Sequence, residues 1–142
     1  MSEPQNQQSM NQLTANELRI GNVLNYGTKE SGIFKPTIID WSDIRLAAEY
    51  PKEFNVLYHR IPLTEDVLLR FGYKKKSDFY YCPDASTRLV LTKSDLGYWF
   101  ELGYDTEDQK TEWNMLTDVQ FSHQLQNLYF ALTGHELKFK PE

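Results

Sequence analysis

The chain has 142 residues and a net charge of −5 at pH 7, and it is rich in aromatic side chains, with nine Tyr, eight Phe and three Trp. This length suits one domain with a core of its own, and the acidic balance argues against a protein that mainly binds duplex DNA. No apolar run reaches the length of a membrane span, the start lacks a secretory pattern, and the single Cys82 has no partner for an internal disulfide. We therefore expect a cytoplasmic protein that does not contact membranes.

The N-terminal part predicts a tail followed by two strands. Residues 1–12 are half Gln and Asn, which is typical of a disordered tail. Residues 18–27 alternate apolar and polar side chains with a change of phase at Gly21, which predicts a strand with a bend or bulge there. Residues 32–40 predict a second strand, and Pro36 either bends it or places it at a sheet edge.

The next segment allows two interpretations. Residues 41–50 predict either one short helix capped by Ser42 or a strand at residues 44–46. Residues 54–63 are rich in Val, Tyr and Ile, so they predict a strand that Pro62 closes.

The stretch "LTEDVLLRFGY" has the features of a short helix. Thr64 is the expected N-cap, acidic residues fill the first turn, and Gly72 is the expected C′ residue. Leu63 and Leu68 have the spacing of a hydrophobic staple. Two turns are too short to be stable alone, so this helix must pack on a sheet.

The following segments are rich in strand-forming residues. Residues 78–82 and 88–92 flank the turn sequence at 83–87 and predict a hairpin. Residues 97–104 and 113–116 predict two further strands, separated by a polar loop.

The last element is expected to be the longest helix. Thr117 and Gln120 fit a capping box, and Gly134 supplies a left-handed stop. One apolar stripe at helical period predicts the buried face: Phe121, Leu125, Leu128, Tyr129 and Leu132. This order of elements predicts an α+β fold, a mainly antiparallel sheet with one short mid-chain helix and one longer C-terminal helix, in a single domain over residues 13–142.

Three stretches together resemble a family of small uncharacterised proteins from phages and integrated mobile elements of gut anaerobic bacteria. They are "NELRIGN" at residues 16–22, "IPLTEDVLLRFGY" at residues 61–73 and "HQLQNLYFALTGHEL" at residues 123–137. The resemblance spans residues 13–137 in the family's order. It implies an accessory protein of a phage or mobile element, in the cytoplasm of the bacterial host, and it brings no activity or catalytic residue with it.

The sequence offers little for catalysis or for a cofactor. His59, His123 and His135 have no zinc-ligand spacing with one another or with Cys82, so no metal site is expected. No phosphate-binding glycine loop and no G-x-S-x-G elbow is present, and we expect no cofactor. Cys82 lies in an aromatic strand before a turn proline, where an inert thiol is commoner than a nucleophile.

Each of two charged regions has two interpretations, a binding site or an ordinary solvated surface. Acidic residues at positions 101, 105, 107, 108 and 112 indicate a solvated connection, or else an acidic patch for a basic partner. A basic–aromatic patch combines lysines with rings that could stack on bases, or is ordinary surface charge. Its members are Lys74, Lys75, Lys76, Tyr80, Tyr81 and Trp99.

The back of the closing helix is the candidate interaction face. Position 130 is nine residues after Phe121, about 180° around the helix, so Phe130 cannot share the expected core face. Either a second layer of the same domain covers Phe130, or it is exposed for a protein contact. The candidate face consists of His123, Gln124, Asn127 and Phe130.

These observations favour a non-catalytic accessory protein that binds another protein, such as a host or defence factor. The alternative is a binding protein for a small molecule, a nucleotide or single-stranded nucleic acid through the basic–aromatic patch. A third is a small enzyme without a recognisable motif, for which His59, His123 or Cys82 would have to lie in a pocket with a carboxylate.

Overall fold

The structure is a computed structural model, and it describes residues 12–83, 89–94, 100–104 and 114–140. Contacts divide the chain into two compact units, an N-terminal unit (Met1–Ile61) and a C-terminal unit (Pro62–Glu142). No linker or change of composition in the sequence marks this boundary. The single domain expected over residues 13–142 stays a prediction, and nearly all of the expected tail lies outside the described residues.

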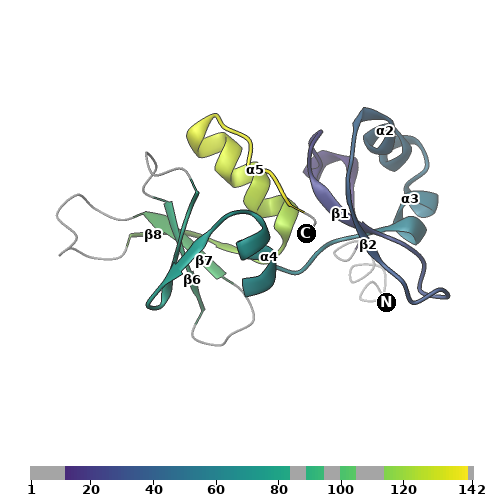
Figure 1. Cartoon of the computed structure of the whole chain (residues 1–142). Helices are drawn as coiled ribbons and strands as arrows, with labels where there is room; N and C mark the ends of the chain where they lie inside the picture. The colour runs from purple at the N-terminus through teal and green to yellow at the C-terminus, as the bar shows by residue number, and fades with distance from the viewer. Residues whose placement is uncertain (1–11, 84–88, 95–99, 105–113, 141–142) are drawn as a thin grey trace, which may run out of the picture. The chain divides into compact units, whose positions relative to one another are not determined.

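The N-terminal unit is a small antiparallel sheet with helices. Its sheet has the order β2-β1-β3, so β2 lies at an edge, which is one of the two possibilities that Pro36 left open. The elements are η1 (Ala15–Glu17), β1 (Val23–Tyr26), β2 (Lys35–Ile38), α2 (Trp41–Glu49), α3 (Pro51–Leu57) and β3 (Tyr58–His59) (Figure 1). One buried cluster joins the sheet to both helices: Leu13, Leu18, Leu24, Ile39, Ala47, Phe54 and Tyr58.

The predicted irregularity at Gly21 is a β-bulge. The Gly21 N–H donates to the Ile39 carbonyl at 3.0 Å, and the Ile39 N–H donates to the Asn22 carbonyl at 2.9 Å, so two residues oppose one. Gly21 has φ of 97°, a left-handed conformation that favours glycine. The Asn22 N–H bonds to the Arg19 carbonyl at 3.0 Å, and the Asn22 Oδ1 accepts from the Arg19 N–H at 2.6 Å, which closes a tight turn before β1.

The helix predicted over residues 41–50 is present as α2, but Asp40 rather than Ser42 is its N-cap. The Asp40 Oδ1 accepts from the N–H groups of Ser42 at 3.0 Å and Asp43 at 3.3 Å, while the Asp43 Oδ2 accepts from the Asp40 N–H at 2.9 Å. Hydrogen bonds, that from the Ser42 hydroxyl first, hold the pKa of Asp40 below its usual range. The alternative of a strand at residues 44–46 is therefore wrong.

The strand expected over residues 54–63 is also wrong for most of its length. Residues 51–57 form α3, and only Tyr58 and His59 are in a strand. Pro51 occupies the first helical turn, where its fixed φ suits a helix. Phe54 on α3 is completely buried. The segment is helical because this tertiary packing outweighs its β-propensity.

The C-terminal unit is a five-stranded antiparallel meander with two helices. The strand order β4-β5-β6-β7-β8 follows the chain, and every neighbouring pair is antiparallel. The α+β class with mainly antiparallel sheet and a closing C-terminal helix is thus confirmed. The elements are α4 (Glu65–Arg70), β4 (Lys74–Lys76), β5 (Phe79–Tyr81), β6 (Leu89–Lys93), β7 (Phe100–Tyr104), β8 (Asn114–Val119) and α5 (Ser122–Thr133).

The local signals of α4 are confirmed. The Thr64 Oγ1 accepts from the Val67 N–H at 3.2 Å at the N-terminus. At the other end, Gly72 has φ of 92°, its N–H bonds to the Leu69 carbonyl, and the Tyr73 N–H bonds to the Leu68 carbonyl, each at 3.0 Å. These two bonds form a Schellman motif, which satisfies the last carbonyls of the helix.

The closing helix begins later than its sequence suggests. Thr117 lies in β8, opposite Leu102, so the capping box expected at Thr117 and Gln120 is wrong. Instead the Gln124 Oε1 accepts from the N–H groups of Gln120 at 3.0 Å and Phe121 at 3.1 Å. The predicted left-handed stop is confirmed, because Gly134 has φ of 76°.

Candidate functional site

The interaction face expected on α5 does not form as a continuous surface. His123 is fully buried, and its ring stacks on Phe121 with centroids 6.2 Å apart. His123 therefore lies on a covered part of the candidate face. The later start of α5 explains this difference: Phe121, on which the helical periodicity was based, precedes the helix.

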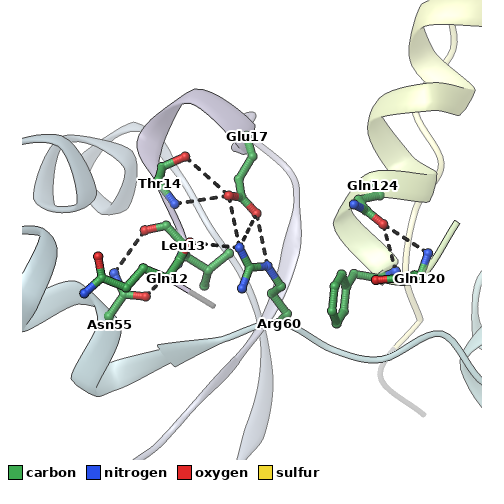
Figure 2. A network of polar contacts seen from close by, with 9 residues as sticks. Gln12, Leu13, Thr14, Glu17, Asn55, Arg60, Gln120 and Gln124 are labelled. Atoms are coloured by element: carbon green, nitrogen blue, oxygen red, sulfur yellow. Dashed lines mark hydrogen bonds and ion pairs between the residues drawn. The ribbon is translucent and has the colours of Figure 1, made fainter. Parts of the chain in front are cut away.

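The other members of that face have separate surroundings. Gln124 is exposed, and its amide caps the start of α5 (Figure 2). Asn127 is half-buried, and Phe130 is 38% exposed. Of the two possibilities left open for Phe130, partial exposure is the observed one, but only Gln124 accompanies it as an exposed neighbour of the predicted set.

The buried face of α5 contains a glutamine that the periodicity did not reveal. Gln126 is 2% exposed, and its Nε2 donates to the Leu137 carbonyl at 3.0 Å. Leu125 and Tyr129 are buried as predicted, whereas Leu132 of the expected stripe is half-exposed. The role of Gln126 is to hold the segment after α5, whose side chains Leu137 and Phe139 are also buried.

The basic–aromatic patch is divided between the two faces of the sheet. The Tyr80 hydroxyl donates to Glu65 Oε1 at 2.6 Å, and Lys75 Nζ lies 3.1 Å from the same oxygen. Burial, then the bond to Glu65, raises the pKa of Tyr80 to about 12, while Tyr80 and Lys75 lower the pKa of Glu65. Lys75 and Tyr80 thus serve an internal contact with α4, and Trp99 lies outside the described residues.

The exposed edge of β2 is a surface that the sequence analysis missed. Phe34, Pro36 and Ile38 alternate along the chain, and the register places Pro36 and Ile38 on the sheet face that carries Asn25 and His59. The Phe34 ring contacts the His59 ring edge-on, with centroids 5.1 Å apart. Phe34 is 41% exposed and Ile38 is 49% exposed. We call Phe34, Pro36 and Ile38 the edge row.

The backbone of β2 has hydrogen-bonding groups that point away from the sheet. Ile39 directs its N–H and its carbonyl toward β1, as its bonds to Asn22 and Gly21 show. Because the direction alternates along a strand, Ile38 directs both groups away from β1. The backbone of Pro36 also points away from β1, a position that suits a residue without an N–H because no bond to β1 is lost. Among the described residues, no strand pairs with this side of β2.

A polar network fastens the start of the described chain to the N-terminal unit. Arg60 forms a two-point contact with Glu17, each N–O distance being 3.2 Å, and its Nη2 donates to the Gln12 carbonyl at 2.8 Å (Figure 2). The Asn55 Oδ1 accepts from the Leu13 N–H at 2.7 Å, and its Nδ2 donates to the Leu13 carbonyl at 3.0 Å. These contacts hold the segment before β1 and thereby support the sheet to which β2 belongs.

The candidate catalytic side chains have structural surroundings. His59 Nε2 lies 3.0 Å from the Gly27 carbonyl, and Cys82 is a half-buried thiol. The described residues contain no group of three or more His, Cys, Asp or Glu side chains arranged to hold a metal ion. In the same part of the chain, no helix has the length and apolar character needed to cross a membrane.

Comparison with known proteins gives no relative: the chain matches no protein-family model, no curated protein sequence and no solved structure.

Proposed function

We propose that this chain is a non-catalytic accessory protein of a phage or mobile element, and that it acts by binding another protein through the edge of β2. The phage origin rests on the three sequence signatures at residues 16–22, 61–73 and 123–137. The single observation that carries the binding role is an edge strand with outward backbone groups next to two exposed apolar side chains, Phe34 and Ile38.

The expected mode of binding is strand addition. A partner strand beside β2 would pair with the outward N–H and carbonyl of Ile38 and with the carbonyl of Pro36. Phe34 and Ile38 would supply the apolar contact, since backbone bonds give affinity and alternate side chains give specificity. Lys35, Pro36 and the four-residue length of β2 limit pairing along this edge, so a partner strand would bind mainly at Ile38 and against the exposed side chains of Phe34 and Ile38.

Matched single substitutions test the proposal. Ile38→Pro removes the outward N–H without removing a bond to β1. A matching proline at Val56 would break α3, so the controlled pair is Ile38→Lys and Val56→Lys, whose side chains are both exposed in the same unit. Tagged full-length variants are incubated with lysate of a gut anaerobic bacterium, and captured proteins are identified by mass spectrometry.

The expected result is that the wild type and Val56→Lys capture the same protein, whereas Ile38→Lys and Ile38→Pro lose it. Circular dichroism of each variant checks that the fold is kept. Equal capture by all four proteins, or capture of nothing specific by the wild type, would contradict the proposal.

A further inference from the structure

We propose that the outer face of β4 and β5 binds single-stranded nucleic acid. The register pairs Lys74 with Tyr81 and Lys76 with Phe79, so these four side chains lie on one face of the sheet. Lys75 and Tyr80 lie on the other face, where they contact Glu65. The outer face therefore presents two lysines along the edge strand and two aromatic rings on the strand beside it.

The rings have the arrangement of a stacking platform. Phe79 and Tyr81 are both partly exposed, and their centroids are 6.5 Å apart with an interplanar angle of 58°. Stacking on aromatic side chains suits bases of any sequence, because every base has a π-face. A duplex does not offer its bases in this way, so the rings favour a single strand.

The lysines are available to phosphate groups. Lys74 and Lys76 are exposed, and within the described ranges neither forms an ion pair, in contrast to Lys75. Because β4 is an edge strand, a nucleic-acid backbone can follow it without meeting another strand of the described sheet. Two such contacts are few, so the binding is expected to be salt-dependent but less steeply than for a strongly basic protein.

The charges on the rest of this face restrict where a strand could lie. The register runs from Phe79 through Thr92 to Glu101 and Asp118, so the far side of the same face is acidic. Asp78 is exposed in the turn between β4 and β5. A nucleic acid is therefore confined to β4 and β5, with its phosphates along the lysines and its bases over the rings.

Fluorescence anisotropy with labelled dT15 and rU15 tests this site in the full-length protein. Replacing Phe79 and Tyr81 together by Leu keeps apolar bulk but removes the π-faces, and we expect affinity to fall about tenfold or more. Lys74→Gln with Lys76→Gln is compared with Lys138→Gln with Lys140→Gln, which changes the net charge equally at other exposed positions. Comparing dT15 with rU15 distinguishes DNA from RNA as the preferred strand.

The salt dependence gives a second readout. Two phosphate contacts predict a slope of log affinity against log salt of about −1.4, which the Lys74/Lys76 variant loses and the Lys138/Lys140 variant keeps. The absence of oligonucleotide binding by the wild type at low salt, or equal weakening by both lysine pairs, would overturn the proposal. Binding of an oligoglutamate peptide in place of both oligonucleotides would also overturn it, since it would assign the lysines to an acidic protein strand.

Discussion

Asn55 on α3 belongs to the polar network that fastens the start of the described chain to the N-terminal unit, and the cost of removing its side chain can be calculated. Its side chain makes three hydrogen bonds, two with the backbone of Leu13 and one, at 2.8 Å, to the Pro51 carbonyl. At about 1 kcal/mol net for each bond, three bonds contribute roughly 3 kcal/mol. Because Asn55 is only half-buried, water replaces part of this, so we expect Asn55→Ala to lower the free energy of unfolding by about 2 kcal/mol. That corresponds to roughly a 30-fold change in the unfolding equilibrium.

Two further variants make the test specific to the hydrogen bonds. Asn55→Asp keeps an acceptor for the Leu13 N–H but places a carboxylate oxygen beside two carbonyl oxygens, so it should be less stable than Asn55→Ala. Asn16→Ala is the control, because Asn16 is exposed and a surface change of this kind usually stays within about 0.5 kcal/mol. Urea unfolding followed by circular dichroism measures stability, and hydrogen exchange measures protection of the Leu13 amide.

A stability for Asn55→Ala within about 0.5 kcal/mol of the wild type, with unchanged exchange at Leu13, would show that the Asn55 hydrogen bonds do not stabilise the fold. Equal stability of Asn55→Asp and Asn55→Ala would refute the assignment of the two donated bonds.

Three other perturbations have defined outcomes. Tyr73 is buried and its hydroxyl has no hydrogen-bond partner in the described part of the chain, so Tyr73→Phe should raise the melting temperature, by removing a cost of about 1–3 kcal/mol. Gly72→Ala should cost more than Gly134→Ala in urea unfolding, because both sites are left-handed but only at Gly72 does an added Cβ meet another residue, Pro83 at 3.3 Å; equal losses would contradict this. Because the pKa of Tyr80 is raised to about 12 in the folded protein, the protonated hydroxyl stabilises the fold fully below pH 10, and this stabilisation is lost as the pH rises toward 12. Unfolding measured across this pH range should show a smaller loss of stability in Tyr80→Phe.

Elements whose signals are local were predictable from the sequence. The start and end of α4 depend on Thr64 and Gly72, which lie within one turn of the helix. Pro36 limited β2 to an edge position or a bend, and Gly21 indicated a bend or a bulge before β1. In each case one residue determines the backbone through its own geometry or its own missing donor.

Elements determined by distant contacts were not predictable. The Thr117–Gln120 pattern fits a capping box, but Thr117 instead pairs with Leu102 on β7, and this ladder with a distant strand outweighs the local pattern. The residues of α3 have the composition of a strand, and what makes them helical is the burial of Phe54 in a cluster assembled from the whole N-terminal unit. The edge row was not predictable for the same reason, since its exposure depends on which side of β2 the sheet occupies.

The residues of the three signature stretches mainly build the fold. Glu17 pairs with Arg60, and Asn22 closes the turn before β1. In the closing stretch, Gln124 caps α5 and Gln126 holds the segment after it. Gln124 and Gln126 of the closing helix therefore have structural roles, and the surfaces proposed for binding lie on β2 and on β4 and β5.

Strand addition at the edge of β2 is tested most directly by the amide hydrogen exchange of β2, resolved by residue with NMR. We expect slow exchange at Thr37 and Ile39, whose N–H groups point toward β1, and fast exchange at Ile38, whose N–H points outward and is open to a partner strand. Addition of the captured partner should then slow exchange at Ile38. Slow exchange at Ile38 in the isolated protein, with fast exchange at Thr37, would contradict the orientation of the edge and the binding role built on it.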